Sequence, residues 1–133
     1  MAAASTSATI PGVKPPQLVM GACWTGMGMA CVVAPGTVLS LSLRPEFLPE
    51  TGTKVEKTAE LLMQCFGAQA VMTGLSLLTN PMSETSAKAW LCGLAPFVVF
   101  DYVFWARGML TDFGAGGDLA GNVVFAACSV ALM

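Results

Sequence analysis

The sequence predicts an all-α polytopic membrane protein, a four-helix transmembrane bundle, and two observations carry this prediction. Of the 133 residues, 55% are apolar and only 11% are charged, and the mean hydropathy is +0.70. A soluble domain is typically about 25% charged, and a fold of this size cannot cover its surface with so few charges. The second observation is that the charges cluster and leave long apolar runs. The composition excludes a disordered chain, a nucleic-acid-binding protein with a basic face and an ordinary soluble enzyme.

Four apolar runs fit a membrane-spanning helix, which needs about 20 residues to cross a hydrocarbon core of roughly 30 Å. Residues 15–43, 61–83 and 119–133 contain no charged side chain, and residues 89–106 contain only Asp101. The last run is short, so a three-span bundle is the fallback. We predict helices near 17–41, 59–79, 86–106 and 116–132.

Residues 1–14 are predicted to form a polar tail ahead of a single transmembrane domain at 15–133. The tail is rich in Ala, Ser and Thr but lacks the repeated arginines of an amphipathic presequence. Pro15 and Pro16 suit the first turn of a helix. The dipeptide Pro35-Gly36 should kink the first helix or end it, because proline lacks the amide donor that a helix interior needs.

The basic residues indicate an orientation. In a four-span topology, Lys14 and Lys88 fall on one side of the membrane, and four cations fall on the other: Arg44, Lys54, Lys57 and Arg107. By the positive-inside rule, the side with four cations is the one that is not translocated, so both termini lie opposite.

Small residues at helical spacing predict faces for helix packing, because they let two backbones approach closely in lipid. In the first helix these residues are Ala22, Gly26 and Ala30, with Gly21, Thr25 and Gly28 nearby. In the second they are Gly67, Ala70 and Gly74. The pattern leaves open whether each face packs inside the chain or against another subunit.

Asp101 is the best candidate for a functional carboxylate, because an acid inside a membrane span is costly and often functional. It lies in an aromatic-rich run, Phe97 to Trp105, which is also typical of the membrane interface. The plainer interpretation is an interfacial residue or a salt bridge to another subunit. The alternative is a proton relay.

No intrinsic cofactor is predicted, although structural lipids are expected around the bundle. The chain has no histidine, and no two of its five cysteines share a C-x-x-C spacing, so we read the thiols as small packing groups. If the chain belongs to a photosynthetic complex, an oxygen ligand to chlorophyll magnesium could come from Glu60, Gln64, Gln69 or Asn122.

The layout resembles the small four-helix membrane proteins of the DoxX-like class. The resemblance rests on Pro45-Glu46-Phe47-Leu48-Pro49, then Phe66-Gly67-Ala68-Gln69 leading into Thr73-Gly74-Leu75, and Gly117-Asp118 opening a short last helix. It implies a helical bundle. It implies no activity, because that class shares no catalytic constellation.

The sequence favours a non-enzymatic accessory subunit of a large energy-transducing membrane complex, with other membrane subunits and lipids as partners. A respiratory or ATP synthase complex of the mitochondrial inner membrane is our first choice, and a photosynthetic supercomplex of the thylakoid membrane is the second. The alternative is a small transporter or channel in which Asp101, Gln64, Gln69 and Asn122 line a polar path. A membrane enzyme ranks last, because no pairing of nucleophile and base is visible.

Overall fold

The computed structural model describes residues 11–133, so most of the predicted tail lies outside the described residues. The described chain is helical: α1 (Pro15–Val33), α2 (Pro35–Ser42), the 3₁₀ turn η1 (Pro45–Phe47), α3 (Lys54–Thr79), α4 (Glu84–Ala106) and α5 (Asp112–Leu132). Four of these helices are long and apolar enough to cross a membrane, namely α1, α3, α4 and α5. The predicted all-α four-helix bundle is confirmed, and the three-span fallback is not needed.

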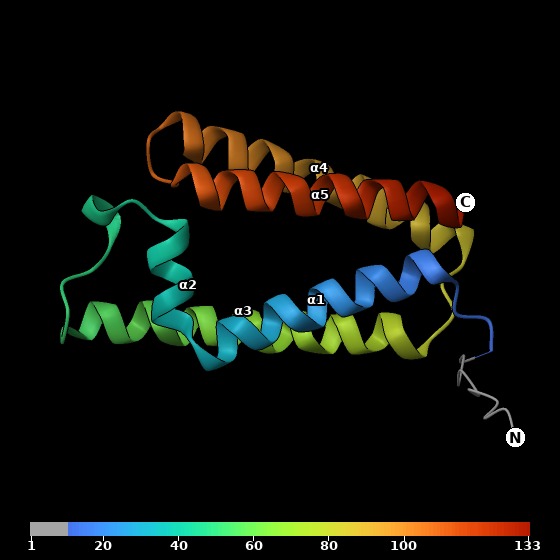
Figure 1. Cartoon of the computed structure of the whole chain (residues 1–133), viewed down its shortest axis with the longest axis horizontal. Coiled ribbons are helices and arrows are strands. Elements are labelled where there is room, and N and C mark those ends of the chain that lie inside the picture. The colour runs from blue at the N-terminus through green and yellow to red at the C-terminus, as the bar shows by residue number, and fades with distance from the viewer. Residues whose placement is uncertain (1–10) are drawn as a thin grey trace, which may run out of the picture.

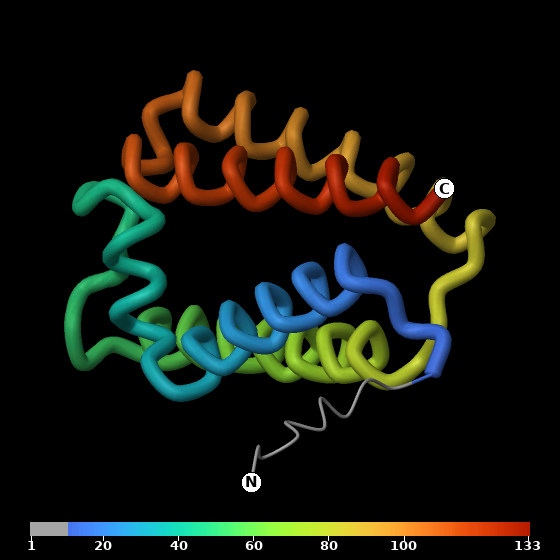
Figure 2. The backbone as a smooth tube through the Cα atoms, turned by 45° about the vertical axis from the view of Figure 1, so that its right-hand side comes forward, coloured from blue at the N-terminus to red at the C-terminus, as the bar shows by residue number. Residues whose placement is uncertain are grey.

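The four long helices form two layers (Figures 1 and 2). One layer pairs α1 with α3, the other pairs α4 with α5, and α1 faces α5 between the layers. The helices of each pair run in opposite directions, so the start of α1, the α3–α4 connection and the C-terminus share one end of the molecule (Figure 1). The Nζ of Lys14 donates to the Leu132 carbonyl at 3.4 Å at that end. The other end holds the long α1–α3 connection and the α4–α5 turn.

The predicted first helix near 17–41 is not one helix, and this prediction is corrected. The helix ends at Val33, because Ala34 leaves helical geometry (φ −135°, ψ 57°) and Pro35 has no amide to donate. The remainder is α2, which turns away and crosses from the α3 side to the α5 side (Figure 1). With 19 residues, α1 still extends about 28 Å.

The last helix is longer than predicted, because a threonine begins it earlier. Thr111 Oγ1 accepts from the Gly114 amide at 2.9 Å, which starts α5 at Asp112 instead of near 116. Thr53 does the same for α3, accepting from the Glu56 amide at 3.2 Å. The extra turn gives α5 its 21 residues, enough to span a bilayer.

Backbone-to-backbone approach holds α1 against α3. A Cβ added to Gly28 would lie 2.6 Å from the Gly67 carbonyl oxygen, and one added to Gly74 would lie 2.7 Å from the Gly21 carbonyl oxygen. No side chain larger than hydrogen fits at these crossings. The α3 face predicted from Gly67, Ala70 and Gly74 is accordingly buried against α1.

The predicted small-residue face of α1 has no packing partner within the described residues, so its role in helix packing stays a prediction. Ala22, Gly26 and Ala30 are exposed, and a Cβ on Gly26 would meet no atom within 4 Å. Gly21 and Gly28 are the residues that face α3. The two sets of small residues lie on opposite faces of one helix, and the buried face is the one that also carries Gln17 and Met20.

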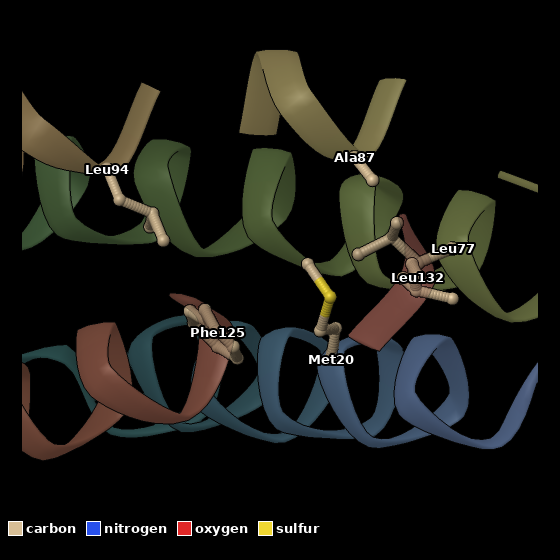
Figure 3. Close-up of a cluster of buried hydrophobic side chains, with 6 residues drawn as sticks. All are labelled: Met20, Leu77, Ala87, Leu94, Phe125 and Leu132. Atoms are coloured by element: carbon tan, nitrogen blue, oxygen red, sulfur yellow. The ribbon is translucent and has the colours of Figure 1, made fainter. Parts of the chain in front are cut away.

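Aromatic and aliphatic side chains join the two layers. Trp24 on α1 stacks on Phe125 of α5 with ring centroids 5.7 Å apart and meets Trp90 of α4 edge-on at 5.9 Å. Six buried side chains continue this core: Met20, Leu77, Ala87, Leu94, Phe125 and Leu132 (Figure 3). This core lies toward the end of the bundle that holds the start of α1, the α3–α4 connection and the C-terminus.

Candidate functional site

The buried side chain of Gln17 ties three segments together at the end of the bundle that holds the C-terminus. Its Nε2 donates to the Leu77 carbonyl at 2.6 Å and to the Asn80 carbonyl, and its Oε1 accepts from the Met82 amide at 3.0 Å. Those carbonyls end α3, where no further helical amide reaches them. Sequence analysis missed this residue. The available signal was a lone amide in the first turn of an apolar helix, whose polar group must find partners in lipid.

Gln64 supplies a hydrogen-bond donor at the break between α1 and α2. Its Nε2 donates to the Val32 carbonyl at 3.2 Å, a group that a continuous helix would have satisfied with the amide four residues on. Glu60, one turn earlier on α3, lies beside the start of α2, because a Cβ on Gly36 would be 2.8 Å from Glu60 Oε1. A carboxylate there is favoured by the partial positive charge of the helix start.

Asp101 is paired within the chain. Asn122 Nδ2 of α5 donates to Asp101 Oδ2 of α4 at 3.0 Å, and both side chains are partly buried. Asp101 follows Ala87 and Leu94 at intervals of seven, so it continues the face of α4 that packs on α5. Asp118 lies one turn before Asn122 on the same face of α5. The site is therefore an interhelical carboxylate–amide contact with a second carboxylate nearby.

The four residues predicted as chlorophyll ligands lie in three different surroundings. Gln64 and Glu60 lie at the α1–α2 break, Asn122 is bonded to Asp101, and Gln69 is exposed on α3. No hydrogen bond among residues 11–133 joins Gln64 or Gln69 to Asp101, and of the four residues predicted to line a polar path the structure pairs Asn122 with Asp101. In the same residues, no group of three or more Cys, Asp or Glu side chains could hold a metal ion. All five cysteines are free thiols.

A set of hydrogen bonds closes the end of the molecule that holds the α1–α3 connection and the α4–α5 turn. Arg44 and Thr111 exchange backbone bonds with the opposite segment: the Arg44 amide donates to the Met109 carbonyl at 3.0 Å, and the Thr111 amide donates to the Ser42 carbonyl at 2.9 Å. The Nε of the Arg44 side chain also donates a hydrogen bond to the Leu110 carbonyl at 3.1 Å. Gly114 allows this approach, because a Cβ there would lie 2.7 Å from the Ser42 carbonyl oxygen.

Two small-residue faces remain open on the outside of the bundle. The α1 outer face consists of Ala22, Gly26 and Ala30, and the α5 outer face consists of Gly116, Gly117 and Ala120. All six residues are exposed. A Cβ on any of the three glycines would meet no atom within 4 Å. Neither face has a packing partner in the part of the chain that the structure describes.

The comparisons with known proteins return nothing: no family model, no curated protein and no solved structure matches the chain. The resemblance to the DoxX-like class therefore stays a prediction.

Proposed function

We propose that this integral membrane protein is a non-catalytic accessory subunit whose α1 and α5 outer faces pack against helices of other subunits. The observation that carries the proposal is that both faces keep small residues at helix-packing spacing although nothing in the described chain covers them. Helix association in lipid relies on close packing, and small residues make that packing possible.

The internal α1–α3 contact supports the proposal. There the same residue types, at Gly21, Gly28, Gly67 and Gly74, bring two backbones into contact. Glycine inside a helix costs about 1 kcal/mol relative to alanine. Gly26, Gly116 and Gly117, like Gly93 and Gly121, carry that cost although a Cβ there would meet no atom within 4 Å. At the α1 and α5 outer faces a partner helix would offset it.

The shape of the chain supports the same role. Most of the described residues lie in membrane-length helices, and the side-chain amides of Gln17, Gln64 and Asn122 donate to neighbours within the bundle. We propose an energy-transducing complex as the host, with a respiratory or ATP synthase complex of the mitochondrial inner membrane first. A photosynthetic supercomplex of the thylakoid membrane is second, and there the exposed Gln69 is the residue best placed to reach a pigment.

The test is a native gel of membranes solubilised in mild detergent, with the chain detected by an antibody. We expect migration in a complex far larger than 13.7 kDa, the mass of the chain. Gly26→Leu and Gly117→Leu should each shift the chain to smaller species, because leucine blocks close approach. Gly93→Leu is the matched control, since Gly93 is also an open helical glycine but belongs to neither face. Migration of the wild-type chain only as a free species would contradict the proposal.

A small transporter is the second candidate, and the pairing of Asp101 with Asn122 inside the bundle favours it. A carboxylate held by an amide between two helices, with Asp118 one turn away, is a possible relay for protons. The discriminating measurement is proton flux in vesicles that contain only this chain. Flux that Asp101→Asn abolishes while the bundle stays folded would favour transport over the accessory role.

A further inference from the structure

The outer side of α4 carries an apolar groove that the bundle does not use. Its lining residues are all apolar and run along about two and a half turns of the helix: Ala95, Pro96, Val99, Phe100, Val103 and Phe104. The groove is shallow and widely open along its length, and Phe100 and Phe104 form one wall with ring centroids 4.2 Å apart. It lies on the face of α4 opposite the one that carries Leu94 and Asp101 toward α5.

A cation stands at the end of this groove. Arg107 follows Val103 by four positions and Phe100 by seven, so it continues the same face of α4 just beyond the last helical turn. Its side chain is exposed and makes no ion pair or hydrogen bond with any residue in 11–133. The acid nearest in sequence, Asp112, instead accepts from Trp105 Nε1 at 3.0 Å.

A second guanidinium lies beside the same turn. Arg44 Nη1 is 3.8 Å from the position that a Cβ on Gly108 would occupy. Because the Nε of Arg44 is fixed on the Leu110 carbonyl, its terminal nitrogens stay at this end of α4. Arg44 therefore places a second positive charge beside Gly108, the residue that follows Arg107.

The dimensions match one leaflet of a bilayer. From Ala95 to Phe104 the groove extends about 14 Å, close to half of the roughly 30 Å hydrocarbon core. With its 23 residues, α4 is slightly longer than that core, so Arg107 reaches the headgroup level, where Trp105 is also a typical interfacial anchor.

We propose that the α4 groove and Arg107 form a binding site for an anionic phospholipid, with one acyl chain in the groove and the phosphate on the Arg107 and Arg44 guanidiniums. A guanidinium presents a planar pair of donors that fits a phosphate, and basic sites beside membrane helices select anionic headgroups. The site is independent of the α1 and α5 outer faces, so it holds whether or not the chain is an accessory subunit.

The test is native mass spectrometry of the whole purified chain in detergent, titrated with dioleoyl phosphatidylglycerol or dioleoyl phosphatidylcholine. We expect the anionic lipid to bind with at least about fivefold higher affinity, because each basic residue at a membrane surface contributes roughly that factor. Arg107→Gln should remove most of this preference. Lys88→Gln, the matched control at the other end of α4, should keep it.

A second variant separates the groove from the charge. Val99→Trp fills the groove from an exposed position, where Val99 is 62% exposed, so the fold tolerates it. This variant should weaken both lipids while Arg107→Gln weakens mainly the anionic one. Equal affinity of the wild-type chain for the two lipids would overturn the proposal. So would a lipid-free dimer that Val99→Trp dissociates, because a second copy would then occupy the groove.

Discussion

Glycine has a different place in each of the two helix pairs: it lies at the α1–α3 crossing but away from the α4–α5 contact. In the α1–α3 pair, glycines lie at the crossing, and an added Cβ at Gly28 or Gly67 would lie within 2.7 Å of backbone oxygen. In the α4–α5 pair, the glycines of the helix middles, Gly93 and Gly121 among them, have no atom within 4 Å of that position. Here side chains make the contact, through Leu94, Phe125 and the Asp101–Asn122 bond.

The difference teaches how a small membrane chain can divide its contacts. Close backbone packing gives α1 and α3 their extensive interface, and this rigid pair can position Trp24 against the second layer. The α4–α5 pair keeps its open glycines and the α4 groove outward, where lipid or other helices can reach them.

Trp24→Ala should have the largest effect, because Trp24 meets rings from α3, α4 and α5. We expect a loss of about 3–5 kcal/mol in the free energy of unfolding, from lost dispersion contacts and the cavity left behind. Unfolding in mixed detergent micelles, followed by circular dichroism, measures the loss. Trp105→Ala at the exposed end of α4 is the control. Equal losses for the two variants would contradict a core centred on Trp24.

Gly74→Leu should cost about 3 kcal/mol, the upper part of the range for overpacking. A Cβ there would lie 2.6 Å from the Thr25 amide nitrogen. This atom belongs to the backbone of α1, which cannot move aside as the end of a flexible side chain can. Gly117→Leu inserts the same side chain where no atom lies within 4 Å, so it should not lower the stability of the isolated chain and should raise it by up to about 1 kcal/mol, the helix cost of the glycine that it removes. The same unfolding titration checks both. Similar losses in the free energy of unfolding for the two variants would contradict the claim that close glycine packing is confined to the α1–α3 pair.

Gln17→Leu should cost about 2 kcal/mol, because it leaves buried backbone groups at Leu77 and Met82 without a partner. Hydrogen exchange should rise at the end of α3 and in the α3–α4 connection, where the lost bonds lie. Gln69→Leu is the matched control at an exposed position without such bonds. Unchanged exchange in the Gln17 variant would show that its hydrogen bonds do not hold this end of the bundle.

The Asp101–Asn122 contact should have the smallest effect. A double-mutant cycle with Asp101→Ala and Asn122→Ala is expected to give a coupling energy of about 0.6 kcal/mol, the average for polar contacts between membrane helices. The cycle is measured by the same unfolding titration. A coupling energy of zero would show that this hydrogen bond does not stabilise the α4–α5 pair.

The sequence predicted the number of spans, because a charge-free run of membrane length is a strong signal. It also marked Pro35-Gly36 as the weak point of the first helix. It could not choose between the two small-residue faces of α1, since Gly21, Gly28 and Gly26 differ only in which way they point, and that depends on where α3 lies. Periodicity alone also gave no partner for Gln17, whose bonds go to residues about 60 positions away.

The helices α3 and α5 begin earlier in the chain than predicted, because hydropathy does not reveal the N-cap residues that start them. Thr53 and Thr111 are the N-caps, and each is followed by polar or charged residues that a search for apolar runs excludes. The sequence also could not predict the Asp101–Asn122 contact. Both residues were identified as candidates, but only the packing of α4 on α5 brings them together.

The most direct test of the membrane topology is protease access to epitope tags on sealed vesicles. Tags are placed at the N-terminus, after Met133, and between Thr51 and Gly52, where the α1–α3 connection is exposed. If α1, α3, α4 and α5 each cross the bilayer, the two terminal tags are cut or protected together, and the internal tag behaves in the opposite way. Cleavage of all three tags in intact vesicles would contradict the four-span bundle.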